Sequence, residues 1–210
     1  MRCQWIARKP ELIANLVGLY RGQTTAEDKA LGVAWYPTAR AIVREWADTY
    51  DLPIATVACV MAAISPQCNW ERNLVIAADV LSGSAVSIGG ALHVNVAKAR
   101  RILEDKATAT LEYFPTGPKV ASFALNLAGN DNAITVDGHA AQAAVADVQA
   151  RFTLPWTPYL IFAECYERAA DTVGLAGAEF QAIIWHTWKR KYPWGVKQKL
   201  RQQWSVIGEC

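Results

Sequence analysis

The 210-residue sequence contains no apolar run long enough to cross a membrane. The longest run, residues 54–64, is about half of the roughly 20 residues that a membrane-spanning helix requires. The N-terminal residues MRCQWIARKPEL contain no apolar signal core. We therefore expect a soluble, cytoplasmic protein that does not bind a membrane, and we expect it to be a monomer.

The sequence also lacks closely spaced cysteines. Its five cysteines are odd in number and scattered, at Cys3, Cys59, Cys68, Cys165 and Cys210. This pattern argues against a disulfide framework, a zinc site and an iron–sulfur site. We expect reduced, packed thiols, no bound metal and no cofactor.

Charged residues and strand-like alternation are scarce too. Only 19% of the residues are charged and 52% are hydrophobic, so the chain can bury one substantial core. Residues 132–136 form the one candidate for extended structure. The sequence predicts an all-α fold, a single domain of two lobes: about 55–145 in a central lobe, and 1–54 with 146–210 in a second lobe.

Most of the chain has apolar residues at helical spacing. Residues 54–65 are apolar on all sides and are expected to form the buried central helix. Pro37 is expected to separate two helices, because proline disfavours a helix interior, and Trp35, Tyr36 and Trp46 are interpreted as packing aromatics. Helices are predicted over residues 10–20, 26–36, 37–50, 54–65, 70–81, 92–104, 106–114, 138–152, 158–173 and 177–192, with a small-residue linker over 83–90.

The segment after the central helix is rich in planar polar groups and reads Ser-Pro-Gln-Cys-Asn-Trp-Glu-Arg-Asn over residues 65–73. Gln67, Asn69, Trp70 and Asn73 are candidates for contacting a ligand, which would satisfy their hydrogen-bonding groups. Alternatively the segment is a polar turn in which Asn69 caps the next helix. The two interpretations remain equally favoured by the sequence.

Basic charge is concentrated near the C-terminus, since residues 180–208 contain no acidic residue. Such a patch with interleaved tryptophans is typical of a surface that binds a phosphate backbone and nearby bases. A solvated terminal face is an equally good interpretation. The residues concerned are Lys189, Arg190, Lys191, Lys197, Lys199 and Arg201, with Trp194 and Trp204 between them.

Residues 114–140 carry the most specific pattern. A proline- and glycine-containing hairpin precedes a helix that is expected to open at Pro118, and a second helix is expected to begin at 136–139. Lys119 and Asp137 would then lie at the starts of two neighbouring helices. Side chains there can point into one cleft.

This stretch resembles the helix-hairpin-helix superfamily of DNA glycosylases, in particular the endonuclease III branch. Gly117 and Lys119 match the Leu-Pro-Gly-Val-Gly-x-Lys hairpin, and Val136, Asp137 and His139 match the Val-Asp-x-His end, with the family's spacing of 18 positions between Lys119 and Asp137. Two further segments are similar to the family, at residues 62–67 and 95–102. Together the similarity covers about residues 55–145.

The resemblance implies that the protein binds double-stranded DNA and flips a damaged or modified base into a pocket. Lys119 and Asp137 are its implied catalytic residues, and Thr116 and Gly117 would hold a DNA phosphate. Pro115 and Pro118 depart from the family pattern, because each removes a backbone N–H from that hairpin. The other predicted DNA contacts are Gln67, Asn69, Trp70, Asn73, Lys189 and Arg190, with His139 and Trp185 as accessory residues.

The implied reaction is hydrolysis of the N-glycosidic bond. Asp137 would stabilise positive charge on the sugar, and Lys119 would either attack the anomeric carbon, allowing strand cleavage, or leave the attack to water. The family resemblance extends to phage DNA-hypermodification proteins, which implies a base-modifying transferase as an alternative.

Two readings without catalysis stay open. The protein could be a DNA-binding module that uses the hairpin only to hold phosphates, and Lys119 with Asp137 could be a salt bridge between two helix starts. His139 is interpreted as a capping or packing residue, and Asp137 with His139 lacks the further ligands that a metal site needs.

Overall fold

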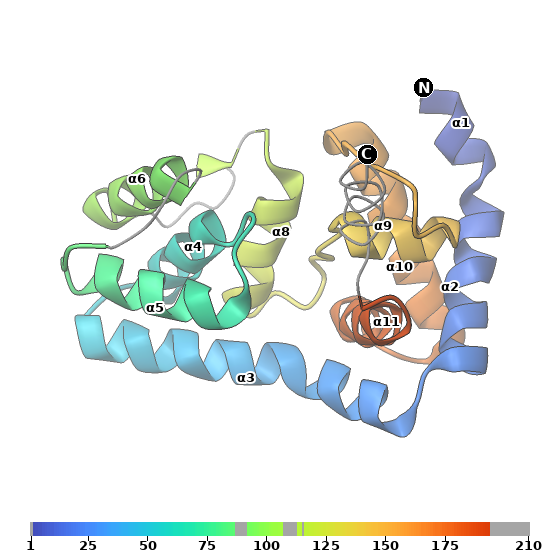
Figure 1. Cartoon of the computed structure of the whole chain (residues 1–210), viewed down its shortest axis with the longest axis horizontal. Coiled ribbons are helices and arrows are strands. Elements are labelled where there is room, and N and C mark those ends of the chain that lie inside the picture. Colours follow the sequence, from blue (N-terminus) through green and yellow to red (C-terminus); the bar gives the residue numbers. More distant parts are fainter. Residues whose placement is uncertain (1, 87–91, 107–112, 115, 194–210) are drawn as a thin grey trace, which may run out of the picture. The chain divides into compact units, whose positions relative to one another are not determined.

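The computed structural model (Figure 1) describes residues 2–86, 92–106, 113, 114 and 116–193. Every regular element among these residues is a helix, which confirms the all-α class. The helices are α1 (Arg2–Ala7), α2 (Lys9–Gln23), α3 (Ala26–Tyr50), α4 (Ile54–Ile64), α5 (Trp70–Leu81), α6 (Leu92–Glu104), α8 (Pro118–Leu127), α9 (Gly138–Val145), α10 (Trp156–Val173) and α11 (Gly177–Lys191).

The chain divides into two compact units, each with its own core. Unit 1 consists of Met1–Ala34 and Val136–Cys210, and unit 2 consists of Trp35–Thr135. The boundaries therefore differ from those predicted near residues 54 and 146. Helix α3 contributes its first residues to unit 1 and the rest to unit 2.

Unit 2 is built around α4, which packs against α5, α6 and α8 (Figure 1). The side chains from Thr56 to Ile64 are all buried. A helix that is apolar all round gains most when other helices cover every face. The predicted central helix over 54–65 is confirmed, and the predicted helices over 70–81 and 92–104 are confirmed as α5 and α6.

The predicted helix break at Pro37 is wrong, because α3 runs through this proline without interruption. A proline inside a helix costs about 3 kcal/mol and leaves the carbonyl four residues earlier without its partner. That carbonyl belongs to Val33, whose side chain is exposed, so water can reach this side of the helix. Tyr36, Ala39 and Val43 are buried on the other side and hold the helix to unit 2.

Unit 1 is centred on α2 and α10, with α9 and α11 packed against α2. Its fully buried side chains include Leu12 and Leu16 from α2 and Tyr159, Phe162 and Tyr166 from α10. The beginning of α3 crosses α11 closely, since a Cβ on Gly32 would lie 2.5 Å from atoms of Ile183. Only glycine fits this crossing.

Helix α9 is shorter than the predicted helix over 138–152. It ends at Val145, and Ala146 adopts the left-handed conformation with φ 55°. The side-chain amide of Gln142 then donates to the carbonyls of Val148 and Ala150, at 3.0 and 3.1 Å. A buried glutamine thereby fixes a loop where helical spacing alone indicated a continuing helix.

Other boundaries shift by a few residues or remain undescribed. Helix α2 extends beyond the predicted 10–20, α10 begins before residue 158 and α11 ends one residue before 192. Residues 132–136 form no strand. Most of the predicted helix 106–114, part of the linker 83–90, Pro115 and the tail residues Trp194, Lys197, Lys199, Arg201 and Trp204 lie outside the described residues.

Within the described ranges, no individual helix combines the length and apolar character needed to cross a membrane, although α3 and α4 satisfy that test when taken together as one bent pair.

Candidate active site

Asp137 lies at the start of α9, as the sequence indicated, and it is the N-cap residue of that helix. Its backbone is extended, and its Oδ1 accepts a hydrogen bond of 2.8 Å from the backbone N–H of Ala140. This bond satisfies one of the free donors at the helix start, and the positive end of the helix dipole favours the carboxylate. The side chain is only partly buried. The local sequence thus places an oriented acid where solvent still reaches it.

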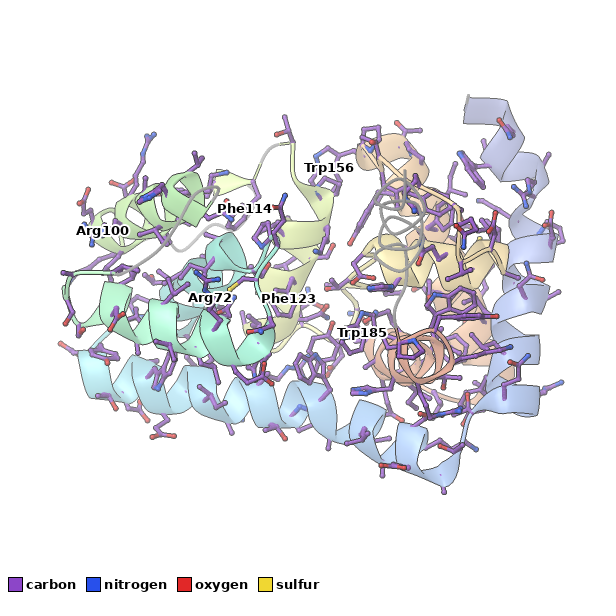
Figure 2. All side chains as sticks on the ribbon, in the orientation of Figure 1. Arg72, Arg100, Phe114, Phe123, Trp156 and Trp185 are labelled. Carbon is purple, nitrogen blue, oxygen red and sulfur yellow. The ribbon has the colours of Figure 1, made fainter. Side chains whose placement is uncertain are left out.

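The second oxygen of Asp137 is held by α11. Trp185 projects from this helix (Figure 2), and its indole Nε1–H donates to Asp137 Oδ2 at 3.0 Å. One turn further along, Lys189 Nζ lies 4.2 Å from the centre of a Trp185 ring. The structure therefore brings together three predicted site residues of unit 1: Asp137, Trp185 and Lys189.

Two buried tyrosines of α10 fix the backbone on either side of Asp137. The Tyr159 hydroxyl accepts the N–H of Val136 at 3.1 Å, and the Tyr166 hydroxyl donates to the carbonyl of Ala140 at 2.9 Å. Complete burial raises the pKa of Tyr166 well above 10, and the negative charge of Asp137 raises it further. Tyr166 therefore stays neutral and acts as a donor.

Lys119 occupies the first turn of α8, in unit 2. The helix begins at Pro118 with Gly117 as its N-cap, which confirms the predicted start. The N–H of Gly117 is used within the hairpin turn, donating to Phe114 at 3.1 Å. Thr116 is exposed and Lys119 is partly buried. Because Pro118 has no N–H, Lys119 carries the first backbone donor of the helix.

A second cation lies beside the hairpin. Lys98 Nζ of α6 is 5.5 Å from the ring of Phe114, the buried residue that leads into the turn (Figure 2). Exposed Arg100 and Arg101 continue the basic character of α6. Beside the hairpin, the positive end of α8 is therefore joined by one side-chain cation, Lys98, whereas Arg100 donates to the carbonyl of Ser84 and Arg101 pairs with Asp105.

The loop between α4 and α5 contains the polar residues that the sequence singled out. Asn69 is the N-cap of α5, its Oδ1 accepting the N–H of Arg72 at 2.9 Å. Gln67 is exposed and has φ 61°, a conformation that non-glycine residues seldom adopt. Asn95 of α6 donates to the carbonyl of Pro66 at 3.2 Å and so ties down the loop. Gln67 is held outward in a strained conformation.

Two other predicted DNA contacts of this segment have internal partners instead. Asn73 is only 1% exposed and donates to the carbonyl of Met61 at 2.9 Å, so it joins α5 to α4. The ring of Trp70 packs edge-on against Trp35 of α3, with centroids 5.1 Å apart. Asn73 is therefore buried between α5 and α4, whereas helical spacing alone did not show which face of α5 is covered.

Arg190 also has an internal partner. It forms a forked ion pair with Asp28, with Nε and Nη2 both within 3.0 Å of the carboxylate, and it donates to the carbonyl of Gln23 at 2.7 Å. Burial opposes ionisation of Asp28, but hydrogen bonds from Arg190 and Thr25 outweigh it and lower the pKa of Asp28 to about 2. Of the predicted pair Lys189 and Arg190, only Lys189 lies beside Trp185, the residue that donates to Asp137.

Sequence features did not assign a role to the residues that support the loop before Asp137. Asn126 is fully buried at the end of α8, and its side chain makes three hydrogen bonds: to the carbonyls of Asn130 and Ala133, and from the hydroxyl of Thr135. Arg40 of α3 donates to the Asn126 carbonyl at 2.7 Å and pairs with Asp131. A polar residue at an apolar helix position was the available signal for Asn126, whereas nothing marked Arg40.

His139 is partly buried in the first turn of α9, and the cap of that helix is Asp137 itself. Among the residues that the structure describes, no group of three or more His, Cys, Asp or Glu side chains could hold a metal ion.

Residues 6–192 match the model of a protein family described as a family of unknown function (DUF7178). No curated protein and no solved structure matches the chain.

Proposed function

The chain belongs to this family of unknown function (DUF7178), and we propose that it is a DNA glycosylase. In this proposal the protein hydrolyses the N-glycosidic bond of a damaged or modified base that has been flipped out of double-stranded DNA. The observation that supports it most is the carboxylate of Asp137, which is partly exposed and has both oxygens oriented by N–H donors.

Such a carboxylate suits cleavage of an N-glycosidic bond. As the bond to the base breaks, positive charge develops on the sugar, and a fixed negative group stabilises that charge without having to reorganise. Each oxygen of Asp137 accepts one of the two hydrogen bonds described above. A carboxylate has about four acceptor positions, so both oxygens retain capacity to orient an attacking water.

Lys119 would give the enzyme a second reaction. Its Nζ would form a bond to the anomeric carbon while the bond from that carbon to the base breaks, and the base would leave with the electron pair and take up a proton. Opening of the sugar ring then gives a Schiff base, from which the strand is cleaved by β-elimination. The position of Lys119 in the first turn of α8, directly after the hairpin, is the support for this role.

In this proposal each unit carries candidate DNA contacts of its own. Gln67 is the candidate for filling the space that a flipped base leaves, because it is exposed and its strained backbone is typical of functional sites. Thr116, Gly117 and Asn69 are further candidate contacts of unit 2 with the DNA backbone. Lys189 is the candidate phosphate contact of unit 1, since it is exposed beside Trp185.

The decisive experiment is a panel of duplexes, each with one deaminated, oxidised, alkylated or enlarged pyrimidine or purine. Release of a free base, detected by mass spectrometry together with an alkali-sensitive abasic site, supports the proposal. A heavier base still attached to its sugar supports a base-modifying transferase. Binding without either product on every duplex would leave a DNA-binding module. The Asp137→Asn variant is the negative control in each case.

The role of Lys119 is tested separately by borohydride reduction during turnover. Wild-type protein is expected to become trapped on DNA, and Lys119→Gln is expected to lose the trapped complex. Lys98→Gln is the matched control, because it removes a second lysine beside the same hairpin. Trapping that survives in Lys119→Gln would exclude Lys119 as the attacking amine.

A further inference from the structure

We infer that Trp185 is a positioning residue for Asp137: its indole N–H sets the orientation of the carboxylate that the proposed reaction needs. The inference rests on the proposed function for its catalytic meaning, and on the contact between Trp185 and Asp137 for its geometry. Neither the position of Trp185 in the sequence nor the pattern around it specifies this role.

The carboxylate has one local constraint and one long-range constraint. The local one is the hydrogen bond from Ala140 N–H to Oδ1, which any N-cap aspartate can make. This bond still leaves rotation of the carboxylate about its last side-chain bond. The long-range one is the bond from Trp185, 48 residues away, to Oδ2. Two donors on two different oxygens fix the plane of the group.

The indole is itself held in place. The ammonium of Lys189 lies over its face, and the ring of His186 meets it edge-on with centroids 5.2 Å apart. An ammonium over an indole face is attracted by the ring quadrupole, and residues four apart on a helix share one side. Trp185 is therefore presented to Asp137 by neighbours on α11.

The backbone of the same segment is fixed from another helix. Tyr159 and Tyr166 of α10 bind the N–H of Val136 and the carbonyl of Ala140, on either side of Asp137. Helix α10 thus fixes the backbone on either side of Asp137, and α11 fixes the orientation of the Asp137 side chain. The two functions are separable, so changing Trp185 should leave the helix start in place.

The choice of tryptophan follows from its chemistry. An indole N–H donates and cannot accept a hydrogen bond, so Trp185 can only donate to the carboxylate oxygen. Phenylalanine retains most of the ring and loses the donor. Trp188, one turn along α11, supplies a matched control: it is buried against Tyr192, and its Nε1 has no hydrogen-bond partner among the described residues.

The test compares Trp185→Phe with Trp188→Phe in the full chain. For Trp185→Phe we expect kcat to fall about tenfold to a hundredfold, while KM, DNA affinity and the melting temperature stay close to wild type. Replacing Trp185 with benzothienylalanine, which has sulfur in place of the N–H, should reproduce the loss. Trp188→Phe should leave kcat unchanged. An unaltered kcat in Trp185→Phe, or an equal loss in Trp188→Phe, overturns the inference.

A spectroscopic measurement tests the contact without turnover. The ¹⁵N–¹H indole resonance of Trp185 should move in Asp137→Asn, and that of Trp188 should stay where it is. If the wild-type protein acts on no duplex, the proposed function fails, and a shifted Trp185 resonance still supports the contact. A Trp185 resonance that does not respond to Asp137→Asn overturns the inference whether or not the protein is active.

Discussion

The hydroxyl of Thr135 donates a hydrogen bond of 2.8 Å to the side-chain oxygen of Asn126, and both residues are buried. With the two bonds from the Asn126 amide to the carbonyls of Asn130 and Ala133, this contact holds the loop that leads from α8 toward Asp137. The Asn126 side chain therefore fixes the conformation of this loop within unit 2.

Replacing Asn126 should therefore destabilise the protein strongly. Asn126→Ala leaves buried carbonyl and hydroxyl groups without partners, and we expect a loss of about 2–4 kcal/mol in the free energy of unfolding. Urea unfolding followed by circular dichroism measures it. Asn132→Ala, at an exposed position of the same loop, should change stability by less than about 0.5 kcal/mol. Equal effects of the two substitutions would contradict the assigned role of Asn126.

Asp137→Asn should separate catalysis from folding and binding. Asparagine is as good an N-cap as aspartate, but its single oxygen can keep only the bond from Ala140 and loses the one from Trp185. The melting temperature should therefore fall by no more than a few degrees. Turnover should fall at least about a hundredfold, because the charge that stabilises the transition state is gone. DNA affinity and its dependence on salt should be nearly unchanged.

The matched control for that variant is Asp147→Asn, which changes an exposed aspartate of the loop after α9. It should keep full turnover. If Asp137→Asn lost binding and turnover in parallel, Asp137 would have a structural role instead.

Replacing Gln67 with glycine should have opposite effects on the stability of the protein and on its turnover of duplex DNA. Gln67→Gly relieves the left-handed backbone conformation and should leave stability equal or raise it by up to about 1 kcal/mol. Turnover on duplex DNA should fall about tenfold, because no side chain then fills the space of the flipped base. Fluorescence of 2-aminopurine next to the target base would measure the opening.

Two variants make this test specific. Gln67→Ala removes the same side chain without relieving the backbone, so it should lose turnover and gain no stability. Asp51→Gly relieves another exposed left-handed residue, with φ 51°, and should stabilise the protein with normal turnover. Normal turnover in Gln67→Ala would remove Gln67 from the DNA interface.

The Asp28 and Arg190 pair should make stability depend on pH in the acid range. Because the pKa of Asp28 is lowered to about 2 in the folded protein, the ionised form stabilises the fold above the ordinary value near 3.9. This contribution is lost as pH falls from about 5 toward 2. Arg190 is 44% exposed, so solvent screens the pair and the loss should be about 1–2 kcal/mol.

Urea unfolding at pH 6 and at pH 3 measures this contribution. Asp28→Asn should be less stable than wild type at pH 6, and the difference should shrink at pH 3. Asp48→Asn, at an exposed position of α3, should follow the wild-type pH dependence. A gap between Asp28→Asn and wild type that is the same at both values would contradict the assignment.

Local features of the sequence were sufficient for much of the fold. The all-round apolar character of residues 54–64 predicted a buried central helix, and Pro118 predicted the start of α8. Asn69 and Asp137 carry the side chains that cap helices, and both do so. These features could be predicted because each depends on residues within one or two helical turns.

Long-range packing decided the rest. The sequence alone did not pair Trp185 with Asp137, Arg190 with Asp28, or Asn73 with Met61, since each contact joins different helices. The helix break predicted at Pro37 was also wrong, because burial of one side of α3 outweighs the local cost of proline. A sequence shows what each residue can do nearby, but which distant group satisfies it depends on how the helices pack.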